Sequence, residues 1–301
     1  MAGKAVTVEV EGRRLRLTNL DKVLYPAAGF TKGQVIDYYT RAAPHLLNHL
    51  RGRALTLKRY PNGVEGGHFY EKQRPAHAPE WVRSKRIEMG DKTIDFVLCD
   101  DLATLVWLAN LADLELHPSL SLAVAPDSPT VLAFDLDPGP PAALLECCRV
   151  GLLLRDTLAK IGLECHAKTS GSKGMQVYAP LNGDADYDRV KPFAHALAKV
   201  LERQHADLIV SVMRKADRTG KVFIDWSQNT RHKTTVGPYS LRALDHPTVS
   251  TPLAWEEVEQ AEAVGSADAL VFGPGDVLER LATQGDLFAG VLTTKQALPT
   301  L

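Results

Sequence analysis

The stretch Phe134-Asp135-Leu136-Asp137-Pro138-Gly139 decides the fold, and it follows the mostly apolar run Thr130-Val131-Leu132-Ala133. This run indicates a strand, which the Pro-Gly pair ends. Because side chains alternate along a strand, Asp135 and Asp137 share one face, while Phe134 and Leu136 point into the core. Neighbouring carboxylates repel each other unless a cation lies between them, and oxygen ligands suit Mg²⁺ or Mn²⁺. The spacing therefore favours a divalent-metal site, although two solvated acids at a strand end would show the same pattern.

A second stretch, Lys168-Thr169-Ser170-Gly171-Ser172-Lys173-Gly174, lies between strand-like runs at 163–167 and 175–179. Its glycines permit backbone conformations that turn N–H groups toward an anion. Ser170 and Ser172 add hydroxyl donors, and Lys173 adds a positive charge. The composition predicts a phosphate cradle, but it lacks the Walker A spacing. An ordinary Gly/Ser hairpin turn is the alternative for this stretch taken alone.

A third stretch, Lys221-Val222-Phe223-Ile224-Asp225-Trp226-Ser227-Gln228-Asn229, carries a third acid. Residues 222–226 have the pattern of a strand that delivers Asp225. Taken singly, Asp225 would be a surface aspartate. Three carboxylates and a phosphate cradle together are the set that two-metal phosphoryl transfer requires.

These motifs carry a family resemblance. Asp-Leu-Asp-Pro-Gly, Thr-Ser-Gly-Ser-Lys-Gly and Val-Phe-Ile-Asp-Trp-Ser-Gln-Asn together resemble the polymerase domain of bacterial DNA ligase D. That domain belongs to the archaeo-eukaryotic primase superfamily and works in non-homologous end joining. The resemblance includes Leu17–Pro26 and Tyr239–Arg242, and it spans roughly residues 15 to 255. The motifs are specific because they occur together and in order.

The resemblance implies template-directed nucleotide addition with two divalent ions, Mn²⁺ or Mg²⁺. Asp135 and Asp137 would hold both metals, and Asp225 would complete the site nearest the primer 3′-OH. The residues that the resemblance assigns to the incoming nucleotide are Lys58, His117, Ser170, Ser172, Lys173, Gln228 and Arg242. For His117 taken alone, a structural histidine would be the simpler interpretation.

The resemblance also implies DNA contacts. Phe69 and Tyr70 match an aromatic pair that packs against bases, with Tyr70 where the family has a second phenylalanine. Arg218 matches a loop arginine that is linked to metal loading. The residues that match a pocket for a DNA 5′-phosphate are Asn19, Lys22 and Lys32. A capping box at Thr31-Lys32-Gly33-Gln34 begins a helix there, and we expect its first N–H groups to point outward and add to this pocket.

The predicted fold class is α+β. From Val131 the pattern is β-α-β-β-α-β, with helices over 141–161 and 188–204, which matches an RNA-recognition-motif-like (RRM-like) sheet that carries the three acids. We expect this sheet to pack against an N-terminal α/β subdomain. The predicted organisation is one primase-polymerase catalytic domain over 1–301. Its parts are a DNA-end-binding subdomain (1–120), the RRM-like catalytic subdomain (121–255) and an acidic helical C-terminal tail (256–301).

Local patterns add four predictions. A hairpin over 6–17 turns at Glu11-Gly12, and another over 83–96 turns at Gly90-Asp91. A helix runs from Thr31 to Gly52. Asp100 caps a second helix, which contains residues 102–111.

Composition limits the class of protein. The chain is 45% hydrophobic, and its longest apolar runs are too short to span a membrane. Residues 1–16 lack the apolar core of a signal peptide. Four cysteines show no zinc spacing, and Cys147 and Cys148 are expected in the core. These features are typical of a protein of a reduced cytoplasm without a membrane partner. The resemblance implies a bacterial protein that acts at the nucleoid.

Charge is uneven along the chain although the net charge is only −1. Residues 1–60 contain eleven Lys or Arg against four Asp or Glu, while residues 245–301 contain two against nine. The basic part is suited to DNA phosphates. We therefore expect the acidic part to face away from DNA.

The predicted substrates are NTPs or dNTPs and DNA ends or gaps with a 5′-phosphate. The chain has no Lys-x-Asp-Gly ligase motif and is too short to add a nuclease module, so it is either a stand-alone enzyme or an excised domain. Its Met1 start and its tail favour the stand-alone enzyme, with Ku and a separate DNA ligase as expected partners. Two alternatives stay open: a primase that initiates chains de novo, and a catalytically silent DNA-end-binding module. The intact acid triad favours catalysis. Preference between ribose and deoxyribose is not decided by the sequence.

Overall fold

The chain divides into two compact units in a computed structural model that describes residues 5–183 and 185–299. Unit 1 contains the chain up to Ser119, with Thr234–Val249 and Gly273–Gly285. Unit 2 contains Leu120–Lys233, Ser250–Phe272 and the chain from Asp286 onward. The division thus differs from the three consecutive segments expected from the sequence, because parts of the C-terminal segment belong to each unit.

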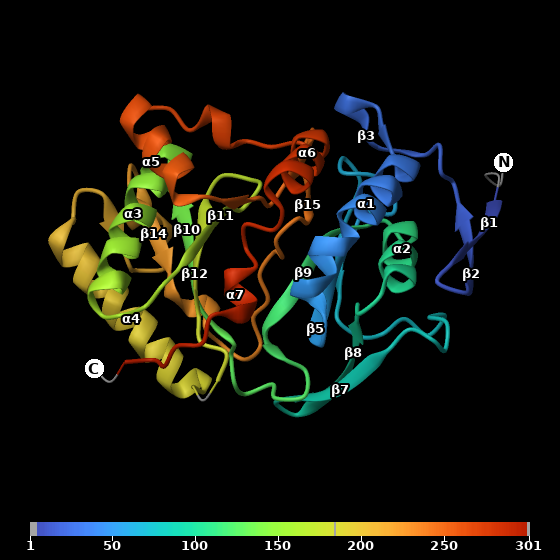
Figure 1. Ribbon diagram of the computed structural model, residues 1–301, viewed down its shortest axis with the longest axis horizontal. Coiled ribbons are helices and arrows are strands. Elements are labelled where there is room, and N and C mark those ends of the chain that lie inside the picture. Colours follow the sequence, from blue (N-terminus) through green and yellow to red (C-terminus); the bar gives the residue numbers. More distant parts are fainter. Residues whose placement is uncertain (1–4, 184, 300–301) are drawn as a thin grey trace. The chain divides into compact units, whose positions relative to one another are not determined.

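Unit 1 is built on a five-stranded sheet in which β5 (Arg53–Arg59) is central. The other strands are β6 (Phe69–Glu71), β7 (Ser84–Met89), β8 (Lys92–Leu98) and β9 (Asp113–Leu122). Helices α1 (Lys32–Leu50) and α2 (Leu102–Asn110) pack against one another beside it (Figure 1). Leu46, Leu55 and Leu108 are buried in the core that these elements share.

Short elements complete unit 1. The hairpin of β1 (Ala5–Val10) and β2 (Arg13–Thr18) is followed by β3 (Val23–Tyr25), η1 (Pro26–Ala28) and β4 (Phe30–Thr31). From later in the chain come β15 (Leu241–Ala243), β16 (Pro247–Val249) and α6 (Pro274–Gln284). Helix α6 packs on α1 and β16. The C-terminal part of the sequence therefore contributes to the unit that the N-terminal part begins.

The two predicted hairpins are confirmed, and one helix cap was misplaced. Glu11 and Gly12 have positive φ angles at the β1–β2 turn, and β7 pairs with β8 around Gly90. The cap of α2 is Asp101, whose carboxylate accepts a hydrogen bond from the Thr104 amide. Asp100 was therefore the wrong residue, since its carboxylate binds the Gly52 amide and Arg83 instead.

Unit 2 is built on a six-stranded sheet with the order β13-β14-β10-β12-β11-β17. The strands are β10 (Val131–Pro138), β11 (His166–Thr169), β12 (Met175–Pro180), β13 (Ile209–Val210), β14 (Val222–Asp225) and β17 (Pro252–Leu253). All neighbours pair antiparallel except β13 and β14. The α+β class with an RRM-like sheet is thus confirmed. The expected strand over 208–213 is reduced to the two residues of β13, which lies at the edge of the sheet and pairs with β14. The neighbour of β10 is β14.

Helices α3 (Leu144–Lys160) and α4 (Tyr187–Gln204) cover one face of this sheet (Figure 1). Phe134 and Leu136 point to that face and are fully buried, as predicted. Helix α7 (Gly290–Thr293) packs on β12, and Phe288 and Val291 cluster with Val131, Ala133 and Tyr178. Because side chains alternate on β10, this cluster occupies the face that also carries Asp135 and Asp137.

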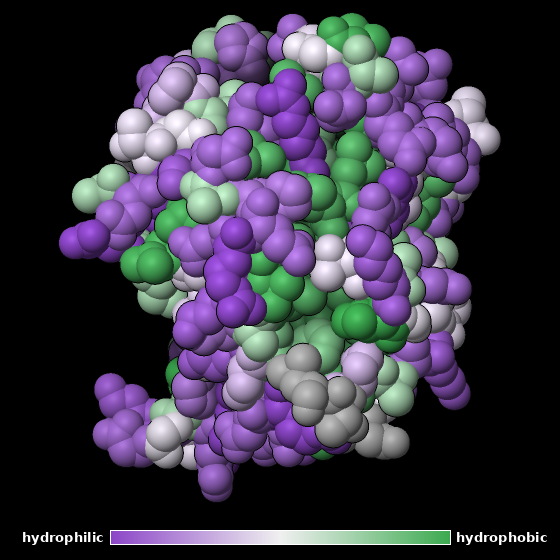
Figure 2. Space-filling model, turned by 90° about the vertical axis from the view of Figure 1, so that its left-hand side faces the viewer, coloured by the Kyte–Doolittle hydropathy of each residue, from purple (hydrophilic) through white to green (hydrophobic). Residues whose placement is uncertain are grey.

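The remaining elements are η2 (Lys215–Arg218), η3 (Trp226–Gln228), α5 (Trp255–Val264) and η4 (Asp268–Leu270). Helix α5 packs on α3. Hydrophilic residues cover most of the side on which α3 and α4 lie, with smaller apolar areas between them (Figure 2). All four cysteines are buried as free thiols, as expected for Cys147 and Cys148. Among the described residues, no helix is long and apolar enough to cross a membrane.

Candidate functional site

The three predicted acids come together on two adjacent strands of unit 2. In the antiparallel register of β10 and β14, Asp135 lies opposite Asp225, and Asp137 follows two residues along β10. Directly opposed residues in such a pair have Cα atoms about 4.5–5.5 Å apart. Two strand ends that are 90 residues apart in the sequence thus bring three carboxylates to one part of the sheet.

Negative charge is concentrated at this triad. Burial and the neighbouring Asp137 carboxylate raise the pKa of Asp135 to about 7. Burial and the charge of Asp225 raise the pKa of Asp137, while Arg218 lowers it. Lys168 offsets part of the charge, because its buried ammonium lowers the pKa of Asp135 and donates to the Ser250 hydroxyl at 2.7 Å. A further cation near the triad would relieve the remaining repulsion.

Hydrogen bonds hold Asp225. One carboxylate oxygen accepts from the amide and the hydroxyl of Ser227, and the other accepts from the Gln228 side chain at 3.1 Å. Lys233, which the sequence analysis missed, has its ammonium 3.8 Å from the same carboxylate. Gln228 therefore contacts a triad acid in this structure, while its predicted contact with a nucleotide stays a prediction.

The triad suits a divalent metal by its chemistry. All of its donors are carboxylate oxygens, which Mg²⁺ and Mn²⁺ prefer, and burial together with the neighbouring carboxylates raises the pKa values of Asp135 and Asp137. However, no group of three or more His, Cys, Asp or Glu side chains within residues 5–183 and 185–299 is already arranged to hold an ion. Metal binding at the triad therefore stays a prediction.

Arg218 lies beside Asp137. Its guanidinium is 3.9 Å from the Asp137 carboxylate, lies 3.8 Å from the centre of the Phe223 ring and donates to the Met213 carbonyl at 2.6 Å. This position suits the predicted link between Arg218 and metal loading, since a cation entering the triad would compete with the guanidinium for Asp137.

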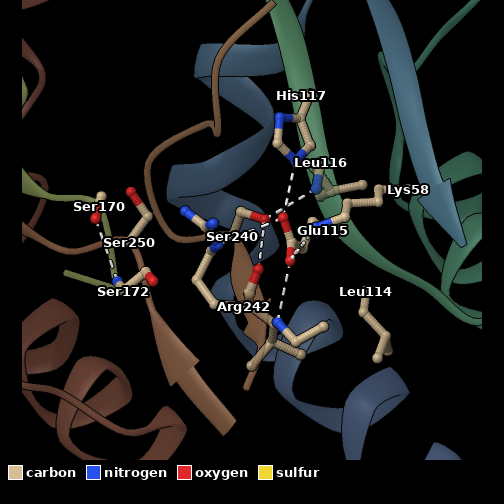
Figure 3. Close-up of polar contacts among 12 residues, drawn as sticks. Lys58, Leu114, Glu115, Leu116, His117, Ser170, Ser172, Ser240, Arg242 and Ser250 are labelled. Carbon is tan, nitrogen blue, oxygen red and sulfur yellow. Dashed lines mark hydrogen bonds and ion pairs between the residues drawn. The ribbon is translucent and has the colours of Figure 1, made fainter. Parts of the chain in front are cut away.

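The predicted cradle is a turn between β11 and β12 that Ser170 organises. The Ser170 hydroxyl oxygen accepts hydrogen bonds from the amides of Ser172 and Gly174, both at 3.2 Å, and the first of these is drawn in Figure 3. Gly171 has a φ of 68°, a left-handed conformation that favours glycine. Ser170 is buried, whereas Ser172 and Lys173 are exposed. Ser170 thus shapes the turn, and Ser172 and Lys173 are the side chains that a phosphate can reach.

Unit 1 holds a second cluster, centred on Glu115 of β9. The Glu115 carboxylate lies 3.0 Å from the Lys58 ammonium, 3.0 Å from His117 Nε2 and 3.4 Å from Arg242 Nε (Figure 3). Three residues predicted to bind nucleotide, from β5, β9 and β15, therefore surround one carboxylate. Glu115 was not among the predicted site residues, although the alternation of Leu114 and Leu116 with Glu115 and His117 has the period of a strand.

The predicted stacking pair is exposed. Phe69 and Tyr70 on β6 have 44% and 59% of their surface accessible, which leaves both rings free to contact a base. The Lys58 ammonium lies 5.6 Å from the centre of the Tyr70 ring, and the His117 ring meets Tyr70 edge-on at 6.2 Å. Tyr70 is thus next to two residues of the Glu115 cluster.

The predicted 5′-phosphate residues lie near the start of α1. Lys32 is buried, with its ammonium 3.4 Å from the Thr18 hydroxyl, and Lys22 donates to the Pro61 carbonyl at 2.6 Å. Burial and the charge of Lys22 lower the pKa of Lys32 to about 8. Asn19 has a φ of 53°, and its carbonyl accepts from the Lys22 amide. A buried lysine whose charge is destabilised by a second lysine forms a suitable environment for an anion.

The expected contribution of the helix N-terminus to this pocket is wrong. The capping box is present, so the Gln34 amide donates to the Thr31 hydroxyl. The amides of Lys32 and Gly33 donate at 2.8 Å to the carbonyls of Lys22 and Leu20. Because the preceding loop folds back over the helix start, these first N–H groups are not free, which leaves phosphate binding to the side chains.

Comparison with known proteins decides the family. The family model described as LigD, primase-polymerase domain, matches residues 31–288. The chain belongs to the LigD primase-polymerase family. Its matched range extends further into the C-terminal segment than the resemblance seen in the motifs, consistent with the contributions of α6 and Phe288 to the two units.

Curated relatives agree with this LigD assignment. The multifunctional non-homologous end joining DNA repair protein LigD of Mycobacterium tuberculosis is 40% identical over 283 residues, which cover 91% of this chain and 36% of that protein. The bifunctional LigD of Bacillus subtilis is 30% identical, covering 90% of this chain and 43% of that protein. The chain therefore spans between about a third and a half of the length of these relatives.

A solved structure gives the same result. The polymerase domain of Mycobacterium tuberculosis ligase D, determined in complex with DNA, matches with a TM-score of 0.86 and 38% identity. The match covers 94% of this chain and 99% of that domain. The LigD primase-polymerase fold is thus confirmed, and membership of this family makes the chain a nucleotidyltransferase of the DNA-directed polymerase class.

Proposed function

We propose that this chain extends primer 3′ ends with nucleotides, directed by a template, at DNA gaps and breaks that carry a 5′-phosphate. The observation that supports this most is the juxtaposition of Asp135, Asp137 and Asp225 on β10 and β14. Nucleotide addition develops negative charge on phosphate oxygens and requires deprotonation of a hydroxyl, and a carboxylate triad is suited to hold the cations for both tasks. The similar ligase D domain solved with DNA supports DNA as the template and primer.

Two divalent ions, Mn²⁺ or Mg²⁺, are the proposed cofactors. Asp135 and Asp137 would hold both ions, and Asp225 would complete the site nearest the primer 3′-OH. When bound, the ions supply Lewis-acid stabilisation for the attacking and leaving oxygens. Ser227 and Gln228 orient the Asp225 carboxylate by hydrogen bonds, and Arg218 neutralises Asp137 when no ion is present.

The proposed roles of the other residues follow from their surroundings. The exposed Ser172 and Lys173 bind phosphate oxygens of the incoming nucleotide, and Ser170 holds their turn in shape. The cluster of Lys58, His117 and Arg242 around Glu115 supplies further nucleotide contacts. Phe69 and Tyr70 offer exposed rings to a base. Lys22 and Lys32, with Asn19 shaping their loop, bind the 5′-phosphate.

Non-homologous end joining in the bacterial cytoplasm, at the nucleoid, is the proposed setting, with Ku and a DNA ligase as partners. The names of the relatives support the pathway. Because this chain spans between about a third and a half of their length, the joining step itself would require activities that lie outside the region of similarity.

The test is primer extension on a gapped duplex with a 5′-phosphate, in Mn²⁺, with NTPs and dNTPs compared. We expect the wild-type protein to add nucleotides complementary to the template, and to do so less efficiently when the downstream end is a 5′-hydroxyl. Asp135→Asn provides the matched inactive control, since it keeps the shape of the side chain and removes its charge.

Two outcomes would replace the proposal. Binding to the gapped duplex without any addition, in either metal and with either sugar, would make the chain a silent DNA-end-binding module. Synthesis on a template without any primer, at a rate equal to extension, would make it a primase that initiates chains de novo.

A further inference from the structure

Glu115 is the common partner of groups from three segments of unit 1. Its carboxylate is only 2% exposed. One oxygen accepts from the Lys58 ammonium at 3.0 Å, the Tyr60 hydroxyl at 3.3 Å and the Ala243 amide at 3.2 Å. The other faces His117 Nε2 at 3.0 Å and Arg242 Nε at 3.4 Å. Both oxygens are therefore occupied by hydrogen bonds or ion pairs within the protein.

Without Glu115, its neighbours would repel one another. Lys58 and Arg242 carry full positive charges, and both side chains are mostly buried, with 13% and 18% exposed. Like charges in such surroundings are poorly screened by solvent. Although burial opposes it, the hydrogen bond from His117 and the charges of Arg242 and Lys58 hold the pKa of Glu115 well below its usual range. A single permanent negative charge thus keeps these side chains together.

Glu115 also orients the His117 ring. A carboxylate only accepts hydrogen bonds, so the atom that faces it at 3.0 Å, Nε2, must carry the proton. Burial lowers the pKa of His117 below its usual value, which leaves the imidazole neutral near pH 7. In that state Nδ1 is an acceptor, and none of the described residues donates to it. The ring therefore presents a lone pair, rather than a positive charge, to a ligand.

Backbone contacts bring Arg242 to this carboxylate. The Leu116 amide donates to the Ser240 hydroxyl at 2.9 Å, and the Tyr25 hydroxyl donates to the Arg242 carbonyl at 3.0 Å. The Leu116 and Ala243 amides thus fix the start of β15 against β9, and the Tyr25 hydroxyl ties it to β3. The arrangement is therefore built into the fold of unit 1 before any ligand binds.

We propose that Glu115 is a positioning residue for nucleotide binding, which gathers Lys58, His117 and Arg242 into one preformed receptor and directs His117 Nδ1 toward the ligand. The proposal rests on the proposed function, because that function makes a nucleotide the ligand of these three residues. Preorganisation of this kind lowers the cost of ordering long side chains when the ligand binds.

The experiment compares two substitutions that separate charge from shape. Glu115→Gln keeps the shape and removes the charge, and its amide presents N–H groups where cations require an acceptor. Glu115→Asp keeps the charge and shortens the side chain by one methylene. We expect the KM for nucleotide to rise about 10–100-fold in Glu115→Gln, as for the loss of one charge-assisted contact, with kcat nearly unchanged. Glu115→Asp should lie between that variant and the wild type.

Asp100→Asn is the matched control. The Asp100 side chain is also mostly buried, at 9% exposed, and is paired with Arg83 in the same unit, but it contacts none of the three predicted nucleotide-binding residues. The KM of Asp100→Asn for nucleotide should equal that of the wild type. Thermal unfolding of each variant shows whether it is folded before KM is compared.

The opposite order of KM values would overturn the proposal. If Glu115→Gln binds nucleotide like the wild type while Glu115→Asp binds poorly, Glu115 fills space and does not position charge. A second measurement, which does not depend on activity, is the ¹⁵N chemical shift of the His117 ring nitrogens in the wild-type protein at pH 7. A proton on Nε2 supports the proposal, and a proton on Nδ1 overturns it.

The ¹⁵N shift and the nucleotide affinities also distinguish a failure of the role of Glu115 from a failure of the polymerase function. If the wild-type protein adds no nucleotide to DNA, the polymerase function fails. The His117 tautomer, and the order of the variants in direct binding of a fluorescent nucleoside triphosphate, would still decide the role of Glu115. Failure of the wild-type protein to bind that nucleotide at all would overturn the receptor.

Discussion

Gly139 lies directly against the backbone of Arg218. A Cβ at position 139 would be 2.0 Å from the Arg218 carbonyl oxygen, which is closer than any real contact. The Gly139 amide donates to the Lys221 carbonyl at 2.8 Å, and the Gly220 amide donates to the Gly139 carbonyl at 3.0 Å. The turn that follows Asp137 and the loop that carries Arg218 are thus joined backbone to backbone.

Gly139→Ala should therefore displace the Arg218 loop. We expect a loss of stability of about 1–3 kcal/mol, as for other insertions into a closely packed site, and a strong loss of nucleotide addition because Arg218 moves away from Asp137. Thermal unfolding and primer extension measure the two effects.

Gly275→Ala is the control for this substitution. Gly275 is exposed in α6, and among the described residues no atom beyond its chain neighbours and the backbone of its own helix lies within 4 Å of where its Cβ would be. Alanine should be neutral or slightly stabilising there, since it favours a helix more than glycine does. Equal unfolding temperatures and extension rates for Gly139→Ala and the wild type would show that the loop adapts without cost.

Asp135→Asn should abolish nucleotide addition and raise stability in the absence of divalent ions. The pKa of Asp135 is raised by burial and by Asp137, so the folded state is destabilised by its charge at neutral pH. Removing that charge removes the repulsion, and it also removes a proposed metal ligand. Thermal unfolding with and without Mn²⁺ should show stabilisation by the ion in the wild type only. A variant that Mn²⁺ stabilises as strongly as the wild type would exclude Asp135 as a ligand.

Lys173→Ala should weaken the binding of nucleotide and leave the binding of DNA unchanged. Lys173 is exposed on the turn that Ser170 organises, so its removal leaves the turn intact. Loss of one charge-assisted contact of about 1.5–3 kcal/mol should raise the KM for nucleotide roughly ten- to a hundredfold. Steady-state kinetics and DNA binding without nucleotide are the measurements. A collapse of DNA affinity would reassign the turn to DNA.

The preference for a 5′-phosphate should depend on pH. The pKa of Lys32 is lowered to about 8 by burial and by Lys22, so its positive charge is complete well below pH 8 and is lost as the pH rises through that value. A terminal phosphate is fully charged over this range, since its second pKa is about 6. The affinity ratio between 5′-phosphate and 5′-hydroxyl ends should therefore fall between pH 7 and pH 9.

Binding to matched gapped duplexes at constant ionic strength measures this ratio. Lys32→Ala should bind the two ends with nearly the same ratio at pH 7 and pH 9, and extension of an open primer–template should be largely retained. A wild-type ratio that stays constant over this range would exclude Lys32 from the phosphate pocket.

Structural features that depend on a few consecutive residues could be predicted from the sequence. The acidic strand, the capping box at Thr31 and the hairpins around Gly12 and Gly90 each depend on a few consecutive residues. Strand β9 was not predicted, although its leucines alternate, because Pro118 interrupts the pattern and proline is uncommon inside strands. Missing β9 also concealed that Glu115 and His117 share a face.

Features that depend on distant parts of the chain were not predictable. Glu115 acquires its importance from Lys58 and Arg242, which lie 57 residues before it and 127 residues after it. The helix start at Lys32 appears free in the sequence, but the carbonyls of Leu20 and Lys22 reach it after folding. The local sequence identifies the helix cap, whereas only the tertiary structure shows which carbonyl groups approach the first amides of the helix.

The division of the chain also has a consequence for its synthesis. The chain crosses between its two units five times, after Ser119, Lys233, Val249, Phe272 and Gly285. A ribosome that has released the first 119 residues has not yet made β15, β16 or α6, which complete the same unit. At about 5–20 residues per second, the N-terminal unit waits roughly ten to thirty seconds for its last helix. Its apolar surface stays incomplete over that time, and neither unit can fold to completion before the residues around Gly285 have been made.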